Sequence, residues 1–124
     1  MTPEQQLQSI VESLRLIAAP ADLQLSLLPD FVCATDEVAT TYGDAFLLVP
    51  QLVRAGLINE AAKESLAELD DWFEDMPRNS TISDRSSLRN HEFWETARKL
   101  AKNALRSLGE EVRAPDLSHI SWID

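Results

Sequence analysis

The chain has 124 residues, 44% of them hydrophobic and 26% charged, and this composition is typical of one folded domain and excludes wholesale disorder. Its 21 acidic residues outnumber the 11 basic ones and give a net charge of −10, which argues against the cationic face that nucleic-acid binding needs. The single cysteine, Cys33, excludes an internal disulfide and a multi-cysteine zinc site, and three glycines are too few for a glycine-rich phosphate loop.

The first predicted helix begins at Thr2 and ends before Pro20. Thr2 can cap it, Pro3 suits the first helical position, and Gln5 can bond back to Thr2 as a capping box. A short leucine-rich segment follows and ends at Pro29. Its alternating leucines also fit a strand, but so few residues between prolines would pair poorly, so we predict a short helix.

A third helix is predicted from a cap at Thr35 or Asp36 to a stop at Gly56, where a left-handed residue can close it. Pro50 lies inside this helix and removes one backbone donor, so we expect a kink there. A break at Gly43, with the following residue as a new cap, is the alternative.

Two further helices complete the prediction. Asn59 caps the first, which runs to about Met76, and residues 78–89 are polar and serine-rich, as in a loop. Asn90 caps the last helix, which Gly109 closes. The apolar residues on the inner face of the Asn59 helix are Ala62, Leu66, Leu69, Phe73 and Met76. Together the elements predict an all-α, single-domain antiparallel bundle of about four to five helices over residues 1–124.

Residues 110–124 are too apolar for a solvated tail, so we expect an extended C-terminal strap that docks on the bundle. Whether it docks on its own chain or on a second copy stays open, and so does the choice between a monomer and a homodimer. The apolar residues of this segment are Val112, Leu117, Ile120, Trp122 and Ile123.

The compartment is expected to be the cytoplasm. The N-terminus lacks the basic region and apolar core of a secretory signal, and the longest apolar run falls far short of the roughly 20 residues that a membrane helix needs. We therefore expect no membrane partner.

The negative charge is concentrated in one predicted helix. Residues 59–77 hold seven acidic residues and one basic residue, whereas residues 78–109 hold seven basic and three acidic ones. At 100° per residue, five carboxylates of the 59–76 helix fall within about 80° of arc, opposite its apolar stripe. We call these five residues the acidic ridge: Glu60, Glu64, Glu68, Asp71 and Asp75. Trp72 lies at the border between this ridge and the core.

Three interpretations of the acidic ridge are open. It can be a solvated face that keeps the protein soluble. It can be a docking surface for a basic partner, with Trp72 as an aromatic anchor, because interfaces favour tryptophan and use charge to speed encounter. It can also be neutralised internally by a line of basic residues on the last helix, Arg98, Lys102 and Arg106.

Other clusters of polar residues do not predict a reaction. His91 and Glu95 are too few to hold a metal. The acidic run at residues 70–75 lacks the spacing that wraps a loop around calcium, and Cys33 has no evident base beside it. A further polar face on the third helix comprises Glu37, Thr41, Asp44 and Gln51. We therefore expect no catalytic residue, no metal site and no cofactor, and no enzymatic activity.

The sequence favours a small acidic helical protein-binding module, which neutralises or escorts a basic protein such as a toxin or nuclease. Immunity proteins, antitoxins and inhibitors that mimic nucleic-acid charge are of this type. The alternative is a structural or adaptor subunit that assembles through its apolar C-terminal tail, and an enzyme with a pocket between helices ranks last. The expected partner-binding residues are Glu60, Glu64, Glu68, Asp71, Trp72 and Asp75.

Overall fold

The computed structural model describes residues 2–28, 34–76 and 87–116, and every regular element in these ranges is a helix. The all-α prediction is confirmed, and the described helices alone account for more than half of the chain. None of them is long and apolar enough to cross a membrane. The elements are α1 (Pro3–Ala18), α2 (Ala21–Leu27), α3 (Ala34–Phe46), α4 (Val49–Arg54), α5 (Glu60–Glu74), α7 (Ser87–Asn90) and α8 (Glu92–Ser107).

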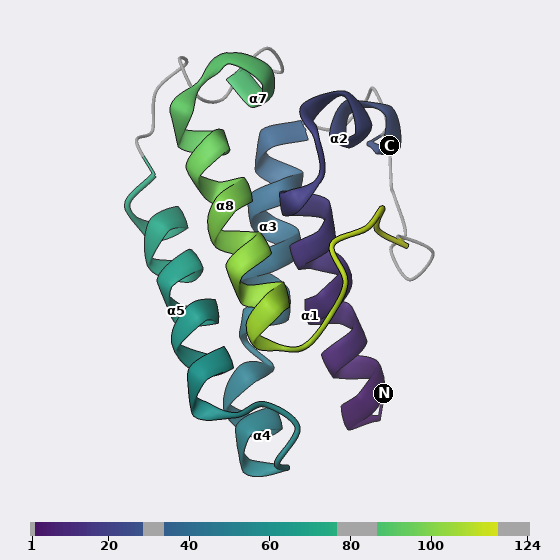
Figure 1. Ribbon diagram of the computed structural model, residues 1–124, viewed down its shortest axis with the longest axis vertical. Coiled ribbons are helices and arrows are strands. Elements are labelled where there is room, and N and C mark those ends of the chain that lie inside the picture. The colour runs from purple at the N-terminus through teal and green to yellow at the C-terminus, as the bar shows by residue number, and fades with distance from the viewer. Residues whose placement is uncertain (1, 29–33, 77–86, 117–124) are drawn as a thin grey trace.

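The four longest helices form an up-down-up-down bundle (Figure 1). α8 lies between α1 and α5, α3 packs on the other side of α1, and α3 also contacts α5. Their inner faces share one hydrophobic cluster. The shorter α4 contacts α1 and α5 at one end of the bundle, whereas α2 and α7 meet at the other end, where Arg89 pairs with Asp22 at 2.7 Å.

α1 begins with the predicted capping box. The Gln5 amide donates to Thr2 Oγ1 at 3.1 Å, and the Thr2 amide donates to Gln5 Oε1 at 2.8 Å. The second half of α1, from Ile10 to Ala18, is buried on every side, because α3 and α8 pack against it and residues 110–116 cover Glu12 and Arg15.

The leucine-rich segment is a helix, as predicted, but its most buried position inside the helix is polar. Gln24 Nε2 donates to the carbonyls of Leu16 and Ile17 at 2.9 and 3.0 Å. These carbonyls belong to the last turn of α1, where the regular hydrogen-bond pattern of a helix runs out. Gln24 of α2 binds both of them, and the Ala19 amide also donates to the Leu16 carbonyl at 3.4 Å.

The third predicted helix is two helices. Neither the expected kink at Pro50 nor the alternative break at Gly43 is present. α3 runs through Gly43 without a break, ends at Phe46, and is followed by α4, which has Pro50 in its first turn. A proline there costs no hydrogen bond, because first-turn amides have no partner within the helix. The expected cap at Thr35 or Asp36 is also wrong, since α3 already begins at Ala34.

The stop at Gly56 is confirmed. Gly56 has a φ of 79°, and its amide donates to the Val53 carbonyl at 3.0 Å. The Leu57 amide donates to the Leu52 carbonyl at 3.0 Å. Together these bonds form a Schellman motif that turns the chain from α4 toward α5.

The cap of α5 is confirmed and that of α8 is not. Asn59 Oδ1 accepts the Ala62 amide at 2.8 Å. At α8, His91 is the cap, because its Nδ1 accepts the Phe93 amide at 3.0 Å. Asn90 instead ends α7, a short helix whose first three residues lie in the range that we expected to be a loop.

Residues 110–116 run beside α1 (Figure 1), and polar groups hold them there. Arg15 is 2% exposed; it binds Glu12 at 2.6 Å, Glu110 at 3.2 Å and the carbonyl of Glu111 at 3.1 Å. The Asp116 amide donates to the second carboxylate oxygen of Glu12. Val112, an apolar residue expected to dock, is 45% exposed. The other four apolar residues named for this tail, Leu117, Ile120, Trp122 and Ile123, lie outside the described ranges.

Candidate functional site

The acidic ridge lies on the outer side of α5, and all five of its residues are exposed. The Asn59 cap starts the helix, and Leu66 and Leu69 on its inner side are fully buried, so packing fixes which face points outward. Within the described ranges, no salt bridge joins a ridge carboxylate to a basic group.

The basic residues of α8 do not neutralise the acidic ridge in the described structure. Arg98 donates to the Leu88 carbonyl at 2.9 Å, and burial lowers the pKa of Arg98 although Glu95 acts in the opposite direction. Arg106 donates to Asn103 at 3.4 Å. The interpretation of internal pairing is therefore wrong for the part of the chain that is described.

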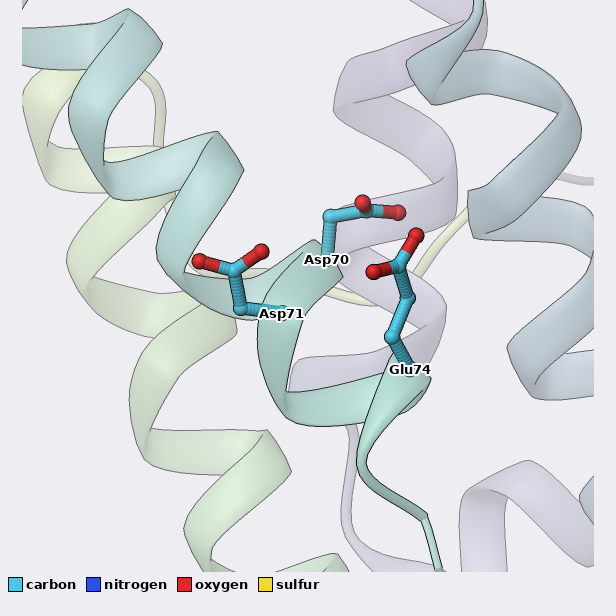
Figure 2. Close-up of side chains that lie close together, drawn as sticks. All are labelled: Asp70, Asp71 and Glu74. Carbon is cyan, nitrogen blue, oxygen red and sulfur yellow. The ribbon is translucent and has the colours of Figure 1, made fainter.

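Three carboxylates, of which Asp71 belongs to the acidic ridge, gather near the end of α5 (Figure 2). Oxygens of Asp70, Asp71 and Glu74 lie within 4.8 Å of one another. Burial, followed by the charges of Glu74 and Asp71, raises the pKa of Asp70. The spacing would suit a divalent cation, but Asp71 and Glu74 are exposed and nothing else at the cluster points to a ligand.

Trp72 is held by contacts with α8. Its indole N–H donates to the Phe93 carbonyl at 3.2 Å, and its ring stacks on Phe93 with the centroids 5.1 Å apart and the planes at 18°. The ring is partly buried. Trp72 therefore forms part of a wall, and its side chain cannot project into a partner without losing these contacts.

A cavity of about 300 Å³ opens at this wall, between the end of α5 and the start of α8. Asp75, the last member of the acidic ridge, and Glu92 both line it and both are exposed. The cavity thus continues the acidic ridge onto α8. Its lining residues are Trp72, Asp75, His91, Glu92, Phe93 and Thr96.

The two remaining groups of polar residues are the His91–Glu95 pair and the polar face of the third predicted helix. The structure gives the members of each group different partners. His91 caps α8, whereas Glu95 lies 3.8 Å from Lys99. On the third predicted helix, one part of the expected polar face stays together: Glu37, Thr41 and Asp44 line a cavity of about 280 Å³. Gln51 belongs to α4 instead and donates to Gln6 of α1 at 3.0 Å. Cys33 lies outside the described ranges.

No protein-family model, curated protein or solved structure matches this chain. The candidate site is therefore defined by its own geometry and charge.

We did not predict from the sequence that α8 contributes residues to this site. The sequence pattern singles out neither Phe93 nor Glu92 as a site residue, because neither belongs to a local motif. The only available signal was indirect: Trp72 near the end of one helix and Phe93 near the start of the next must lie close together if the two helices are antiparallel neighbours.

Proposed function

We propose that this chain is a small protein-binding module, and that its acidic ridge engages a basic protein which the module neutralises or escorts. The observation that supports the proposal is the exposure of all five ridge carboxylates, with no ion pair to any described basic residue. Charges left unpaired on a well-packed helix remain available to an opposite charge on a partner.

The acidic ridge does not help its own helix to fold. Like charges at i,i+4 positions cost about 0.2–0.5 kcal/mol per pair, and Glu60, Glu64 and Glu68 form two such pairs. Solubility is the competing explanation, but it requires only charge dispersed over the surface. A concentrated face would raise the association rate with a cationic surface, which is the behaviour expected of a binder for a toxin or nuclease.

The test compares two charge-reversed baits with the wild type. Glu64→Lys with Glu68→Lys alters the acidic ridge, and Glu4→Lys with Asp44→Lys makes the same change of net charge at exposed positions on α1 and α3. Each bait is used to capture proteins from cells that naturally produce this chain, and the captured proteins are quantified by mass spectrometry. The captured partner is then purified, and its association rate with each variant is measured. Circular dichroism checks that both variants keep the helical spectrum of the wild type.

The ridge variant should lose the partner and the control variant should keep it. Added salt should slow association with the wild type, because charges around an interface act mainly on the encounter rate. Equal association rates for the two variants would contradict the proposal and would favour solubility as the role of the acidic ridge.

A further inference from the structure

Two cavities border the outer face of α5, and they differ in charge. The one between α4 and α5 is mainly apolar and has Arg54 and Lys63 at its edge. The other, beside Trp72, has two carboxylates and a histidine in its lining but neither lysine nor arginine, and the Nδ1 of that histidine, His91, accepts the Phe93 amide. We call this second cavity the Trp72 pocket. It alone of the two complements a basic partner.

We propose that the Trp72 pocket binds one arginine side chain of the basic partner, with the guanidinium against the exposed part of the Trp72 ring and between the carboxylates of Asp75 and Glu92. This inference rests on the proposed function, and it names the side chain that the partner inserts. Guanidinium groups stack on aromatic faces and bind carboxylates through a planar fork of donors, so this pocket combines both kinds of contact.

The aromatic wall packs against the core in the absence of any partner. Trp72 stacks on Phe93, and Phe93 in turn lies edge-on to Trp94 at 5.0 Å and contacts Phe73 at 6.0 Å. Phe93 is 6% exposed and Trp94 is 1% exposed, so both rings belong to the core. A wall that is already ordered spares the partner the entropic cost of ordering it.

The two carboxylates provide the charge at the pocket. Asp75 caps the C-terminus of α5, whose dipole favours a cation, whereas Glu92 begins α8, whose dipole opposes one. These effects offset each other because the two helix ends are adjacent. The side-chain charges therefore decide the preference, and neither carboxylate pairs with a basic residue in the described ranges.

The size of the pocket fits a side chain better than a cofactor. Its volume of about 300 Å³ is at the lower limit for small-molecule sites. Its place at the end of the acidic ridge means that a partner lying along α5 can fill it at the same time. The acidic ridge would then guide the encounter, while the filled pocket would slow dissociation.

The test is a titration with the peptide acetyl-Gly-Arg-Gly-Arg-Gly-Arg-Gly-amide, followed by the NMR signal of the Trp72 indole N–H. Trp72→Phe assigns that signal among the three tryptophans of the chain. We expect a saturable shift, and a weaker one with the lysine version of the peptide. Asp75→Asn with Glu92→Gln should raise the dissociation constant about tenfold, because two charge-assisted contacts are lost.

The control is Glu64→Gln with Glu68→Gln, which removes two charges from α5 outside the pocket. This control variant should leave the shift of the Trp72 indole signal at saturation unchanged. It should raise the dissociation constant of the peptide less than the pocket variant does. The proposal that the Trp72 pocket binds arginine would be overturned if both variants weakened peptide binding equally, or if the peptide did not shift the indole signal. The acidic ridge would still stand if its variants slowed association with the partner.

A second control addresses the arginines of the chain itself. Arg78 and Arg85 lie outside the described ranges, and the variant Arg78→Gln with Arg85→Gln should bind the peptide as the wild type does. Binding that appears only in this variant would assign the pocket to the chain's own arginines and overturn the proposal. Conversely, wild-type binding at the pocket combined with unchanged partner kinetics in the ridge variants would support the pocket and reject the proposed role of the acidic ridge.

Discussion

On α1, the side chain of Glu12 is buried and binds Arg15 and the backbone of Asp116, whereas on α5 the side chains of Glu64 and Glu68 are exposed and pair with no described basic group. The same chemical group therefore has two roles in one bundle. A carboxylate removed from water is costly unless it is paired and hydrogen-bonded, so the contacts of Glu12 belong to the fold. The carboxylates of the acidic ridge carry no such cost, because water solvates them.

Among the single substitutions, we expect the largest effect from Arg15→Met. It would leave Glu12 buried without its cation, and we expect a loss of about 3–5 kcal/mol in the free energy of unfolding, measured by urea denaturation. Arg89→Met is the matched control, since the Arg89–Asp22 pair has side chains that are 56% and 83% exposed and should contribute at most about 1 kcal/mol. Similar losses for both variants would show that burial does not separate the two kinds of pair.

The second prediction compares the two faces of α5. Leu66 is fully buried, so Leu66→Ala should cost about 2–5 kcal/mol through lost contacts and a cavity. Glu64→Gln, two residues earlier on the outer face, should change the stability by no more than about 0.5 kcal/mol. Thermal or urea unfolding of the two variants measures the difference. A neutral Leu66→Ala would mean that the phase of α5 is wrong, and with it the outward direction of the acidic ridge.

The third prediction concerns Asp70, which is intermediate between the two extremes. Its pKa is raised in the folded protein by burial and by neighbouring carboxylates, so the ionised form opposes folding at neutral pH and this cost disappears as the pH falls through the raised pKa. Asp70→Asn should therefore raise the melting temperature at pH 7. The corresponding gain in the free energy of unfolding should be below about 1 kcal/mol, because the carboxyl group is partly solvated. The gain should fade in acid, and a gain that persists at pH 3 would contradict this explanation.

The helix ends show how far local sequence can be interpreted. The capping box at Thr2, the cap at Asn59 and the left-handed Gly56 were all predicted, because each depends on hydrogen bonds between residues only a few positions apart. The boundary at Asn90 was misplaced by one residue, since His91 competes for the same role and α7 uses the residues before it. The exposed positions of the acidic ridge followed from helical periodicity alone.

Contacts between distant residues were beyond this kind of prediction. Nothing near Arg15 in the sequence indicates that residues 110–116 will cover it, and nothing near Trp72 indicates that its ring will stack on Phe93. The all-α class, most of the helix ends and the outward charge of α5 could be predicted, because these depend on periodicity and on neighbours along the chain. The division between α3 and α4 and the short helix α7 were not predicted. The burial of Arg15 and the position of the Trp72 pocket instead depend on the tertiary structure, because residues 110–116 cover Arg15 on α1 and the pocket forms where the end of α5 meets the start of α8.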